Sequence, residues 1–276
     1  MNPSNLRSDP RLIYLLLILV ITVPILTHSV LPVPVSSTTQ ALYDFIEKLP
    51  ANSLVVVSFD YPTSVVPELH PQAIVVTQHL FMRPLKVLFV AQYQDGPALA
   101  DAVLDAIDKG NKTYGVDYAT LGFIPNTATF IGMITNIPQF FPVDTHGNPV
   151  NTLPIVKEFP AGKQAALVIT FSAGEPGLLD YLQYWQSSFN IPVAVGATAS
   201  NAPGYLPFYN SGQLVGILIS IRGAAEYEIL IHRMGISGAT SAMVAQSTSH
   251  LLIVVMVVFG NVAYFVERGR KKGVAK

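Results

Sequence analysis

The order of apolar and polar positions divides the chain into three parts. Two uncharged apolar runs, Leu12 to Leu31 and Leu251 to Val266, lie near its two ends, and no charged Asp, Glu, Lys or Arg falls between Arg233 and Glu267. At a rise of about 1.5 Å per residue, roughly 20 helical residues cover the ~30 Å hydrocarbon layer of a bilayer. The pattern therefore predicts a transmembrane helix at each end of a folded domain.

The basic residues indicate how these helices are oriented. Cations flank the two runs on their outer sides, at Arg7, Arg11, Arg268, Arg270, Lys271, Lys272 and Lys276. On the inner sides the nearest cations are Lys48 and Arg233. Because Lys and Arg resist transfer across the membrane, we expect both termini in the cytosol and the middle of the chain outside the cytoplasm.

Each run also has an alternative interpretation. The first resembles a cleaved signal peptide, but its apolar region exceeds the usual core of roughly 7 to 15 residues, and no A-x-A-like site follows closely. The second contains Gly260 and Asn261 and could form a buried core helix, whereas the basic tail directly after it favours a stop at the cytosolic face. Pro24 kinks a membrane helix without excluding one. We expect both helices to lie in the lipid bilayer.

Prolines follow the first run and prevent the helix from continuing. The expected organisation is a cytosolic tail at 1–11, a transmembrane helix at 12–31, a proline spacer at 32–37, an extracytoplasmic α/β domain at 38–240, a second transmembrane helix at 241–266 and a basic cytosolic tail at 267–276.

Short apolar runs alternate with amphipathic stretches in the middle of the chain. We expect strands over Leu54–Phe59, Lys86–Ala91, Tyr118–Ile124, Ala165–Phe171 and Pro192–Ala197, and helices over Ala41–Leu49, Pro67–Met82, Pro97–Lys109 and Pro176–Phe189. Strands without polar alternation are buried on both faces, which is typical of a parallel sheet covered by helices. The predicted fold class is therefore α/β, a mostly parallel Rossmann-like sheet sandwiched by helices.

Two segments do not fit this alternation. The apolar run Leu214–Ile221 is compatible with a sixth strand or with a buried helix, because nearby glycines occur at uneven spacing. Phe140–Pro160 contains four prolines together with Asp144 and His146, and predicts a long ordered loop at the rim of the sheet. Loops of this length inside a compact domain are uncommon and often functional.

Charge and composition exclude some classes of partner. Residues 36 to 240 contain nine Lys or Arg against fifteen Asp or Glu, so the middle domain is acidic. Nucleic acid is a poor partner for such a surface, since binding a phosphate backbone needs clustered cations. The absence of cysteine excludes disulfides and thiolate metal sites. The domain must therefore be held together by burial of its core.

Candidate ligand-binding residues follow from the expected sheet. In an open parallel sheet, ligands bind at the carboxyl ends of the strands, where strand order reverses. Polar residues at these ends are Asp60, Gln92, Ser172, Glu175 and Thr198. An acid such as Asp60 can bind a cation, a ribose or a donor group there, or it can cap the next helix and bind loop amides. The sequence leaves both roles open.

No catalytic constellation is recognisable in this set. The turn around Ser172 is not G-x-S-x-G and lacks the lysine and spacing of a phosphate-binding loop. The histidines show no metal-ligand spacing, so neither a metal nor a cofactor is predicted.

A second group of polar residues is a candidate for contacts with a partner. Arg222, Glu226 and Glu228 form a polar island in an apolar stretch, and Asn261 is a lone amide within the second predicted membrane helix. The island predicts either a surface for a partner or a sister chain, or close helix packing in which neighbours satisfy the charges. An amide in lipid seeks a hydrogen-bonding partner, which favours a helix–helix contact at Asn261.

Several of these segments resemble those of an uncharacterised family of prokaryotic membrane-anchored α/β proteins with terminal transmembrane helices. The shared features are Tyr43-Asp44-Phe45-Ile46-Glu47, Ser58-Phe59-Asp60-Tyr61, Pro192 to Thr198 with Gly196-Ala197-Thr198, and Ser211-Gly212-Gln213-Leu214 leading to Gly223-Ala224-Ala225-Glu226-Tyr227-Glu228. The resemblance implies the layout of terminal membrane helices around an α/β domain. It implies no activity, ligand or catalytic residue.

These observations lead to two hypotheses of different class. The first is a non-catalytic binding or assembly component of the cell membrane, with a membrane protein partner or a second copy of itself. The second is a membrane-tethered enzyme or small-ligand receptor that uses the strand-end crevice around Asp60, Ser172 and Thr198. Convergence of these side chains on one apolar-walled cleft would favour the second hypothesis, and burial of Asp60 against backbone amides would weaken it.

Overall fold

The computed structural model describes residues 10–27, 29, 34–125 and 131–274. The chain divides into two compact units, one formed by Met1–Pro32 with Thr240–Lys276 and the other by Val33–Ala239. The expected tails at 1–11 and 267–276, the spacer at 32–37 and the end of the helix expected at 12–31 lie partly outside the described residues.

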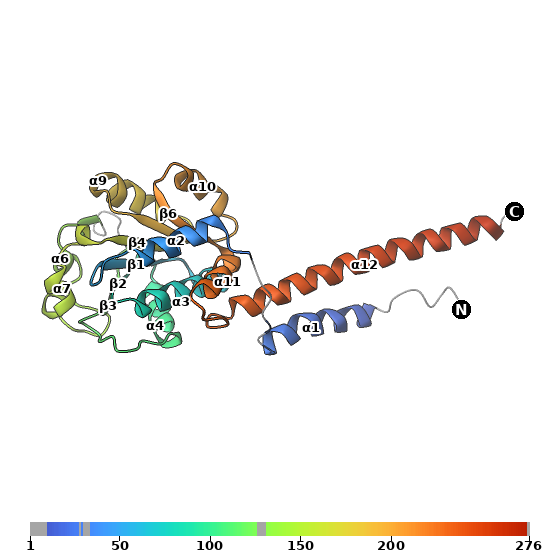
Figure 1. Cartoon of the computed structure of the whole chain (residues 1–276), viewed down its shortest axis with the longest axis horizontal. Helices are drawn as coiled ribbons and strands as arrows, with labels where there is room; N and C mark the ends of the chain where they lie inside the picture. The colour runs from blue at the N-terminus through green and yellow to red at the C-terminus, as the bar shows by residue number, and fades with distance from the viewer. Residues whose placement is uncertain (1–9, 28, 30–33, 126–130, 275–276) are drawn as a thin grey trace. The chain divides into compact units, whose positions relative to one another are not determined.

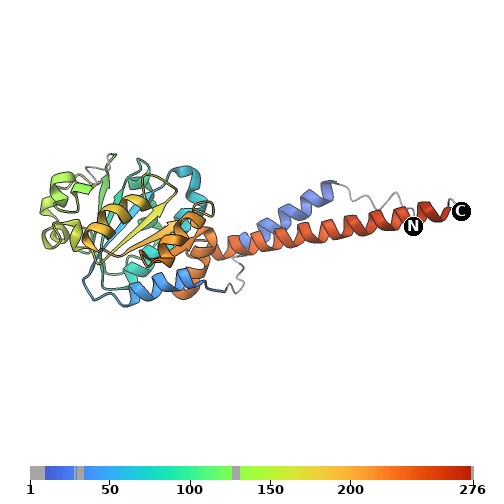
Figure 2. The same cartoon turned by 90° about the horizontal axis from the view of Figure 1, so that it is seen from above.

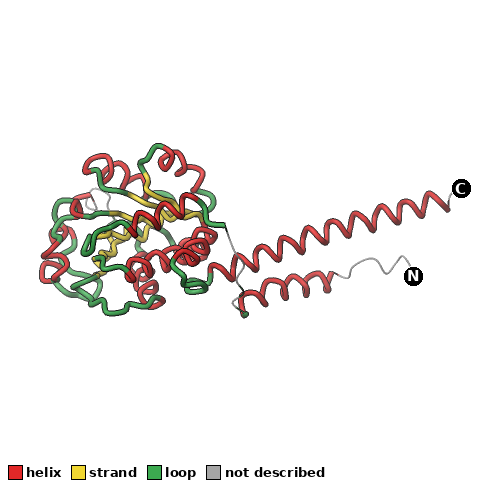
Figure 3. The backbone as a smooth tube through the Cα atoms, viewed as in Figure 1, coloured by secondary structure: helices red, strands yellow, loops and turns green. Residues whose placement is uncertain are grey.

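The larger unit is built on a six-stranded sheet in which every strand pair is parallel (Figures 1 and 3). The strands are β1 (Leu54–Asp60), β2 (Lys86–Ala91), β3 (Tyr118–Phe123), β4 (Leu167–Ser172), β5 (Val193–Ala197) and β6 (Leu214–Ile219). They are arranged in the order β3-β2-β1-β4-β5-β6, which is that of the doubly wound α/β fold. The α/β fold with a parallel sheet is thus confirmed, and the order reverses between β1 and β4.

Helices cover both faces of this sheet (Figure 2). One layer contains α2 (Ser37–Glu47), α3 (Val66–Met82), α4 (Gly96–Ala106) and α11 (Ser220–Leu230). The other contains α6 (Ile137–Phe140), α7 (Pro154–Glu158), α8 (Leu178–Asp180), the π-helical segment η5 (Tyr181–Gln186), α9 (Ser187–Phe189) and α10 (Ala202–Asn210). Short 3-10 turns occur at η2 (Thr63–Val65), η3 (Val150–Thr152) and η4 (Gly162–Gln164).

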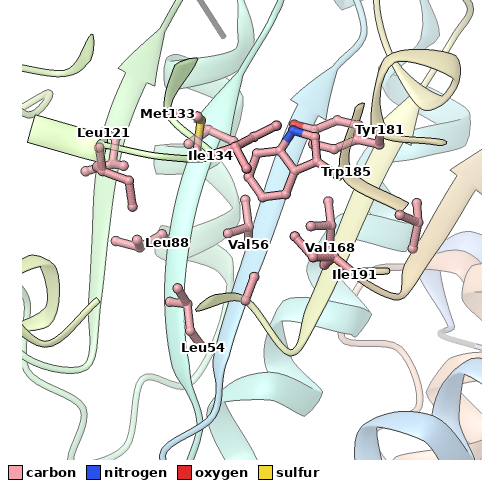
Figure 4. Close-up of a cluster of buried hydrophobic side chains, with 14 of the residues drawn as sticks. Leu54, Val56, Leu88, Leu121, Met133, Ile134, Val168, Tyr181, Trp185 and Ile191 are labelled. Carbon is pink, nitrogen blue, oxygen red and sulfur yellow. The ribbon is translucent and has the colours of Figure 1, made fainter. Parts of the chain in front are cut away.

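Alternate residues of each strand pack against opposite helix layers. Leu54 and Val56 of β1 belong to a buried cluster that includes Trp185 (Figure 4). On the other face Phe59 lies 6.1 Å from Phe89 and 6.0 Å from Phe171, measured between ring centroids. Each fully buried side chain of this size contributes roughly 1.5–3 kcal/mol to folding, so burial on both faces explains the unbroken apolar strands.

Helix α2 approaches the edge strand β6 unusually closely. A Cβ atom added to Gly216 would lie 2.8 Å from the backbone nitrogen of Leu42 in α2. Real Cβ contacts are longer than this, so a residue larger than glycine would force α2 and β6 apart. The glycine in the apolar run Leu214–Ile221 therefore serves packing. The same run combines strand and helix, since β6 ends at Ile219 and α11 begins at Ser220.

Two expected helices differ from their predicted form. The helix predicted over Pro97–Lys109 ends at Ala106, where Gln78 of α3 donates to the Asp108 carbonyl and accepts from its N–H. Both bonds replace helical ones, so a tertiary contact ends the helix. The helix predicted over Pro176–Phe189 begins only at Leu178 and consists of α8, η5 and α9.

The long loop predicted over Phe140–Pro160 contains η3 and α7 and is tightly bonded. Asp144 accepts hydrogen bonds from the backbone N–H groups of His146 and Asn148 and from the Tyr114 hydroxyl. Burial by itself raises the pKa of Asp144, but these donors outweigh it and hold the pKa below its usual value. The Thr145 N–H donates to a carbonyl of the edge strand β3, so the loop protects that edge.

The smaller unit contains two apolar helices, α1 (Pro10–Leu26) and α12 (Ala239–Val274). In α12 the 28 residues Ala239–Val266 are long and apolar enough to cross a membrane, and their most apolar window of 18 residues has a mean hydropathy of 2.1. The apolar part of α1 is shorter, Ile13–Leu26. The Thr248 hydroxyl of α12 lies 2.8 Å from the Val244 carbonyl of its own helix and 3.2 Å from the Val20 carbonyl of α1, so the two helices are in contact.

Candidate functional site

The carboxyl ends of β1 and β4 bring two of the predicted residues together. Asp60 and Ser172 are paired in register across these strands, at the point where strand order reverses. The Asp60 carboxylate is completely buried and accepts three hydrogen bonds: from the Ser58 hydroxyl at 2.7 Å, the Thr170 hydroxyl at 2.7 Å and the Gln92 backbone N–H at 2.9 Å. Asp60 therefore ties β1, β2 and β4 to one another.

Burial dominates the electrostatics of Asp60. Loss of solvent raises the pKa of its carboxyl group to about 6, although the three hydrogen bonds act in the opposite direction. The nearby carboxylate of Asp180 adds to the increase. An acid with a raised pKa at a strand end is a common feature of functional sites. Here, however, both oxygens accept hydrogen bonds from the protein itself, and the carboxylate is completely buried, so it is not exposed to a ligand.

Gln92 and Asp180 lie beside this carboxylate. Burial raises the pKa of Asp180, while the Gly177 N–H and the Gln92 side chain lower it. The Gln92 Nε2 atom is buried and lacks a partner at hydrogen-bond distance among the described residues, although its amide lies near enough to Asp180 to affect that pKa. Gln92 is thus a buried predicted site residue with unused bonding capacity.

The π-helical segment η5 packs against one face of the sheet (Figure 4). Tyr181 and Trp185 are both completely buried, with ring centroids 5.5 Å apart (Figure 4). Burial raises the Tyr181 pKa well above its usual value, and the hydroxyl of Ser58, the residue that donates to Asp60, lies near enough to oppose this increase. π-helical turns often occur at functional sites. In this chain the turn places two aromatic rings in the core between the sheet and its helices, where they contact strand residues such as Val56 and Val168.

Ser172 holds the turn that follows β4. Its hydroxyl donates to the Gly174 carbonyl at 2.9 Å and lies 3.4 Å from the Leu178 N–H. Glu175 is exposed, and its backbone carbonyl accepts a hydrogen bond from Tyr93 at 3.1 Å. Ser172 is therefore positioned as a turn-stabilising residue, and the Glu175 side chain is exposed to solvent.

Thr198 belongs to a different cluster, at the end of β5. Its hydroxyl lies 3.0 Å from that of Ser200 and accepts from the Asn201 N–H, which organises the turn into α10. The same loop is bound to α3, because the Ala199 N–H donates to the Glu68 carboxylate at 2.9 Å. The structure thus separates Thr198 from Asp60, Gln92 and Ser172.

Sequence patterns did not identify Gln72, which is central to this second cluster. Its Nε2 group lies within 3.1 Å of three backbone carbonyl oxygens, those of Glu68, Ala197 and Ser220. The side chain is completely buried and joins α3 to the ends of β5 and β6. A glutamine in a largely apolar helix, which also contains Gln78, was the only available signal. For Thr170 and Ser58 the signal was stronger, since both are hydroxyl residues inside otherwise apolar strands.

The partner-contact candidates Arg222 and Glu226 form an internal contact. The buried Glu226 carboxylate accepts from Arg222 Nε at 2.8 Å and from the Ser36 hydroxyl and N–H at 2.6 and 3.1 Å. Ser36 is the N-cap of α2, so Glu226 fixes the chain where it enters the α/β unit.

Glu228 has the corresponding role where the chain leaves that unit. Its completely buried carboxylate accepts from the Gly235 N–H and from the N–H and hydroxyl of Ser237, at 3.0, 2.8 and 2.6 Å. The structure therefore supports intramolecular packing of the polar island over a partner surface, because neither carboxylate is exposed.

Tyr227, between these two acids, contacts another buried network. The His79 ring lies 2.8 Å from the Tyr227 hydroxyl through Nδ1 and 2.7 Å from Glu47 through Nε2, and it stacks on Tyr43. Burial lowers the His79 pKa, and Glu47 partly opposes this. The arrangement resembles a catalytic relay in composition, but Tyr227 and His79 are buried beneath α2, so they join α2, α3 and α11 without access for a substrate.

The last predicted contact, Asn261, lies on α12. Its side chain is exposed and donates to the Val257 carbonyl one turn earlier, at 2.8 Å.

Comparison with known proteins gives no match: no protein-family model, no curated protein and no solved structure matches the chain. Within the described residues, no group of three or more His, Asp or Glu side chains is placed to hold a metal ion.

Proposed function

We propose that the chain is a non-catalytic binding or assembly component of the cell membrane, which displays an α/β domain outside the cytoplasm. The observation that carries the proposal is the surface of α12. None of its most apolar window is buried, and large side chains such as Leu251, Phe259 and Phe265 are more than 60% exposed. Water is an unfavourable environment for such a surface, and lipid is a favourable one.

We further propose that α1 is retained as a second membrane helix. Its described helix has 17 residues, of which Ile13–Leu26 are the apolar part, and the apolar run of the sequence continues to Leu31. The less exposed positions Ile13, Leu17 and Val20 recur at helical spacing, and the Val20 carbonyl lies 3.2 Å from the Thr248 hydroxyl of α12. A cleaved signal peptide has no need for such a contact. The layout agrees with the family resemblance and with the basic residues outside both helices.

The state of the strand ends supports a non-catalytic role. A site for a ligand or substrate needs polar groups that are accessible and partly unbound. Asp60 is buried and bonded to the Gln92 backbone amide, Ser172 is bonded within its own turn, and Thr198 lies in another cluster. These three residues are the ones on which the rival hypothesis, a membrane-tethered enzyme or receptor, depends, and their arrangement does not favour it.

Membrane association can be tested in a prokaryotic expression host. We expect the full chain to stay in the membrane pellet after extraction at alkaline pH, and protease added to intact spheroplasts to digest the domain while sparing a tag after Lys276. Replacing Val258 by Arg should weaken insertion, since a central Arg costs ~2.5–3.5 kcal/mol, whereas Val258→Leu should not. Extraction of the unaltered protein into the supernatant, or protection of the domain in spheroplasts, would contradict the proposal.

A further inference from the structure

The two sides of α12 differ in what covers them. Thr248, which contacts α1, is followed at helical spacing by the half-buried residues Leu252 and Met256. Val255, on the same side, is 38% exposed, whereas the adjacent Val254 is 58% exposed. In α1 the matching positions Ile13, Leu17 and Val20 are likewise partly buried. One side of α12 is therefore occupied by α1.

Asn261 lies on the other side of the helix. At 3.6 residues per turn, the 13 positions from Thr248 to Asn261 place the two side chains roughly 140° apart around the axis. The residues that share this direction are exposed, and we call them the Asn261 face: Val254, Val257, Val258, Asn261 and Phe265. Helix α1 cannot cover this face, because its contact with α12 is on the opposite side.

The Asn261 amide has bonding capacity that α12 does not use. One N–H donates to the Val257 carbonyl, and the other N–H and the Oδ1 atom have no hydrogen-bond partner in the part of the chain that the structure describes. Lipid offers no hydrogen bonds, so an amide within the hydrocarbon layer is favoured to pair with another protein group.

We propose that the Asn261 face is the docking surface for a second copy of this chain within the bilayer, an inference that rests on the proposed membrane function. A primary amide carries both a donor and an acceptor, so two Asn261 side chains are complementary to each other. Two copies with the same membrane topology lie parallel and place these amides at the same depth. A two-fold axis between them repeats the same valine and phenylalanine contacts on both chains, as in other isologous dimers.

The natural absence of cysteine makes a direct test possible, since any introduced thiol is the only one in the chain. Val254→Cys and Val255→Cys are matched variants, with the same parent residue at almost the same depth. In native membranes treated with an oxidant, we expect the Val254→Cys protein to form a disulfide-linked dimer and the Val255→Cys protein to remain mostly monomeric. Equal cross-linking of the two, or cross-linking of neither, would overturn the proposal.

Asn261 itself is tested by Asn261→Leu, with Asn261→Gln as the control that retains the amide. Interhelical hydrogen bonds of this kind change affinity by about 3- to 30-fold. In detergent, the dimer of the Asn261→Leu protein should therefore have a dissociation constant about 3- to 30-fold higher than that of the parent. The dissociation constant of the Asn261→Gln dimer should stay closer to the parent value. A different membrane protein bound at this face, without dimers of the chain, would also refute the proposal. Failure of the membrane function itself is distinguishable, because all variants would then leave the membrane pellet on alkaline extraction.

Discussion

Replacing Asp60 by Asn tests whether the buried carboxylate at the switch point reduces folding stability at neutral pH. The substitution preserves shape and the three contacts. The amide oxygen can still accept from the Ser58 hydroxyl and the Gln92 N–H, and the new amide group can donate to the Thr170 hydroxyl. Any cost from reorienting the Thr170 hydroxyl, at most about 1 kcal/mol, is independent of pH. Only the charge of the carboxylate is lost.

The expected magnitude follows from the raised pKa. Burial raises the pKa of Asp60 from 3.8 to about 6, so the folded protein holds this proton more tightly than the unfolded chain does. This bound proton stabilises the folded protein fully below about pH 3.8, and its contribution is lost as pH rises through about 6. The free energy of unfolding of the parent therefore falls by ~3 kcal/mol over this range because of Asp60. The free energy of unfolding of Asp60→Asn should therefore exceed that of the parent by ~3 kcal/mol at about pH 8 and by only ~1 kcal/mol near pH 4.5.

The chain contains one natural reporter for this experiment. Trp185 is its only tryptophan and is completely buried beside the switch point, so its fluorescence follows unfolding of the α/β unit in urea. Both proteins are measured as full chains in detergent at the two pH values. The same substitution at Asp105, whose side chain is 85% exposed, controls for the change in net charge. If the free energies of unfolding of Asp60→Asn and the parent differ by the same amount at both pH values, the buried charge of Asp60 does not destabilise the folded protein.

Two further substitutions test the packing of the α/β unit by urea unfolding. Gln72→Glu removes the amide donor that faces three carbonyl oxygens, so we expect a loss of ~3 kcal/mol or more, and no comparable loss for Gln94→Glu at an exposed position. Gly216→Ala should cost ~1–3 kcal/mol by pushing α2 from β6, whereas Gly204→Ala, in a helix with open space around the new Cβ, should be neutral or stabilising. Equal effects within either pair would show that the contact contributes nothing.

The sheet could be predicted because its signal is local. In β1 and β2 almost every residue is buried on one face or the other, so an unbroken apolar run marks each strand regardless of its neighbours. Helix ends were less predictable, because tertiary contacts set them. The bonds between Gln78 and Asp108 end α4 before the helical pattern does, and no signal near Lys109 indicates this.

The role of individual polar residues was harder to predict than the fold. The position of Asp60 at a strand end was predicted, but its use depends on Thr170, 110 residues away in the sequence, and on the π-helical turn that brings Tyr181 near Ser58. A strand-end acid looks the same in sequence whether its donors come from the protein or from a ligand. Only the paired hydroxyls of Ser58 and Thr170, inside apolar strands, indicated the first case.

The two acids of α11 also have partners that their positions in the sequence do not indicate. Glu226 and Glu228 are separated by one residue, and so the sequence suggests a single charged patch. In the structure Glu226 bonds to Ser36, 190 residues earlier, and Glu228 bonds to Ser237, nine residues later. One helix thus holds the chain on both sides of the α/β unit, next to the segments that lead to α1 and α12. Buried carboxylates suit this task, because each accepts several donors from irregular backbone that no regular element would satisfy.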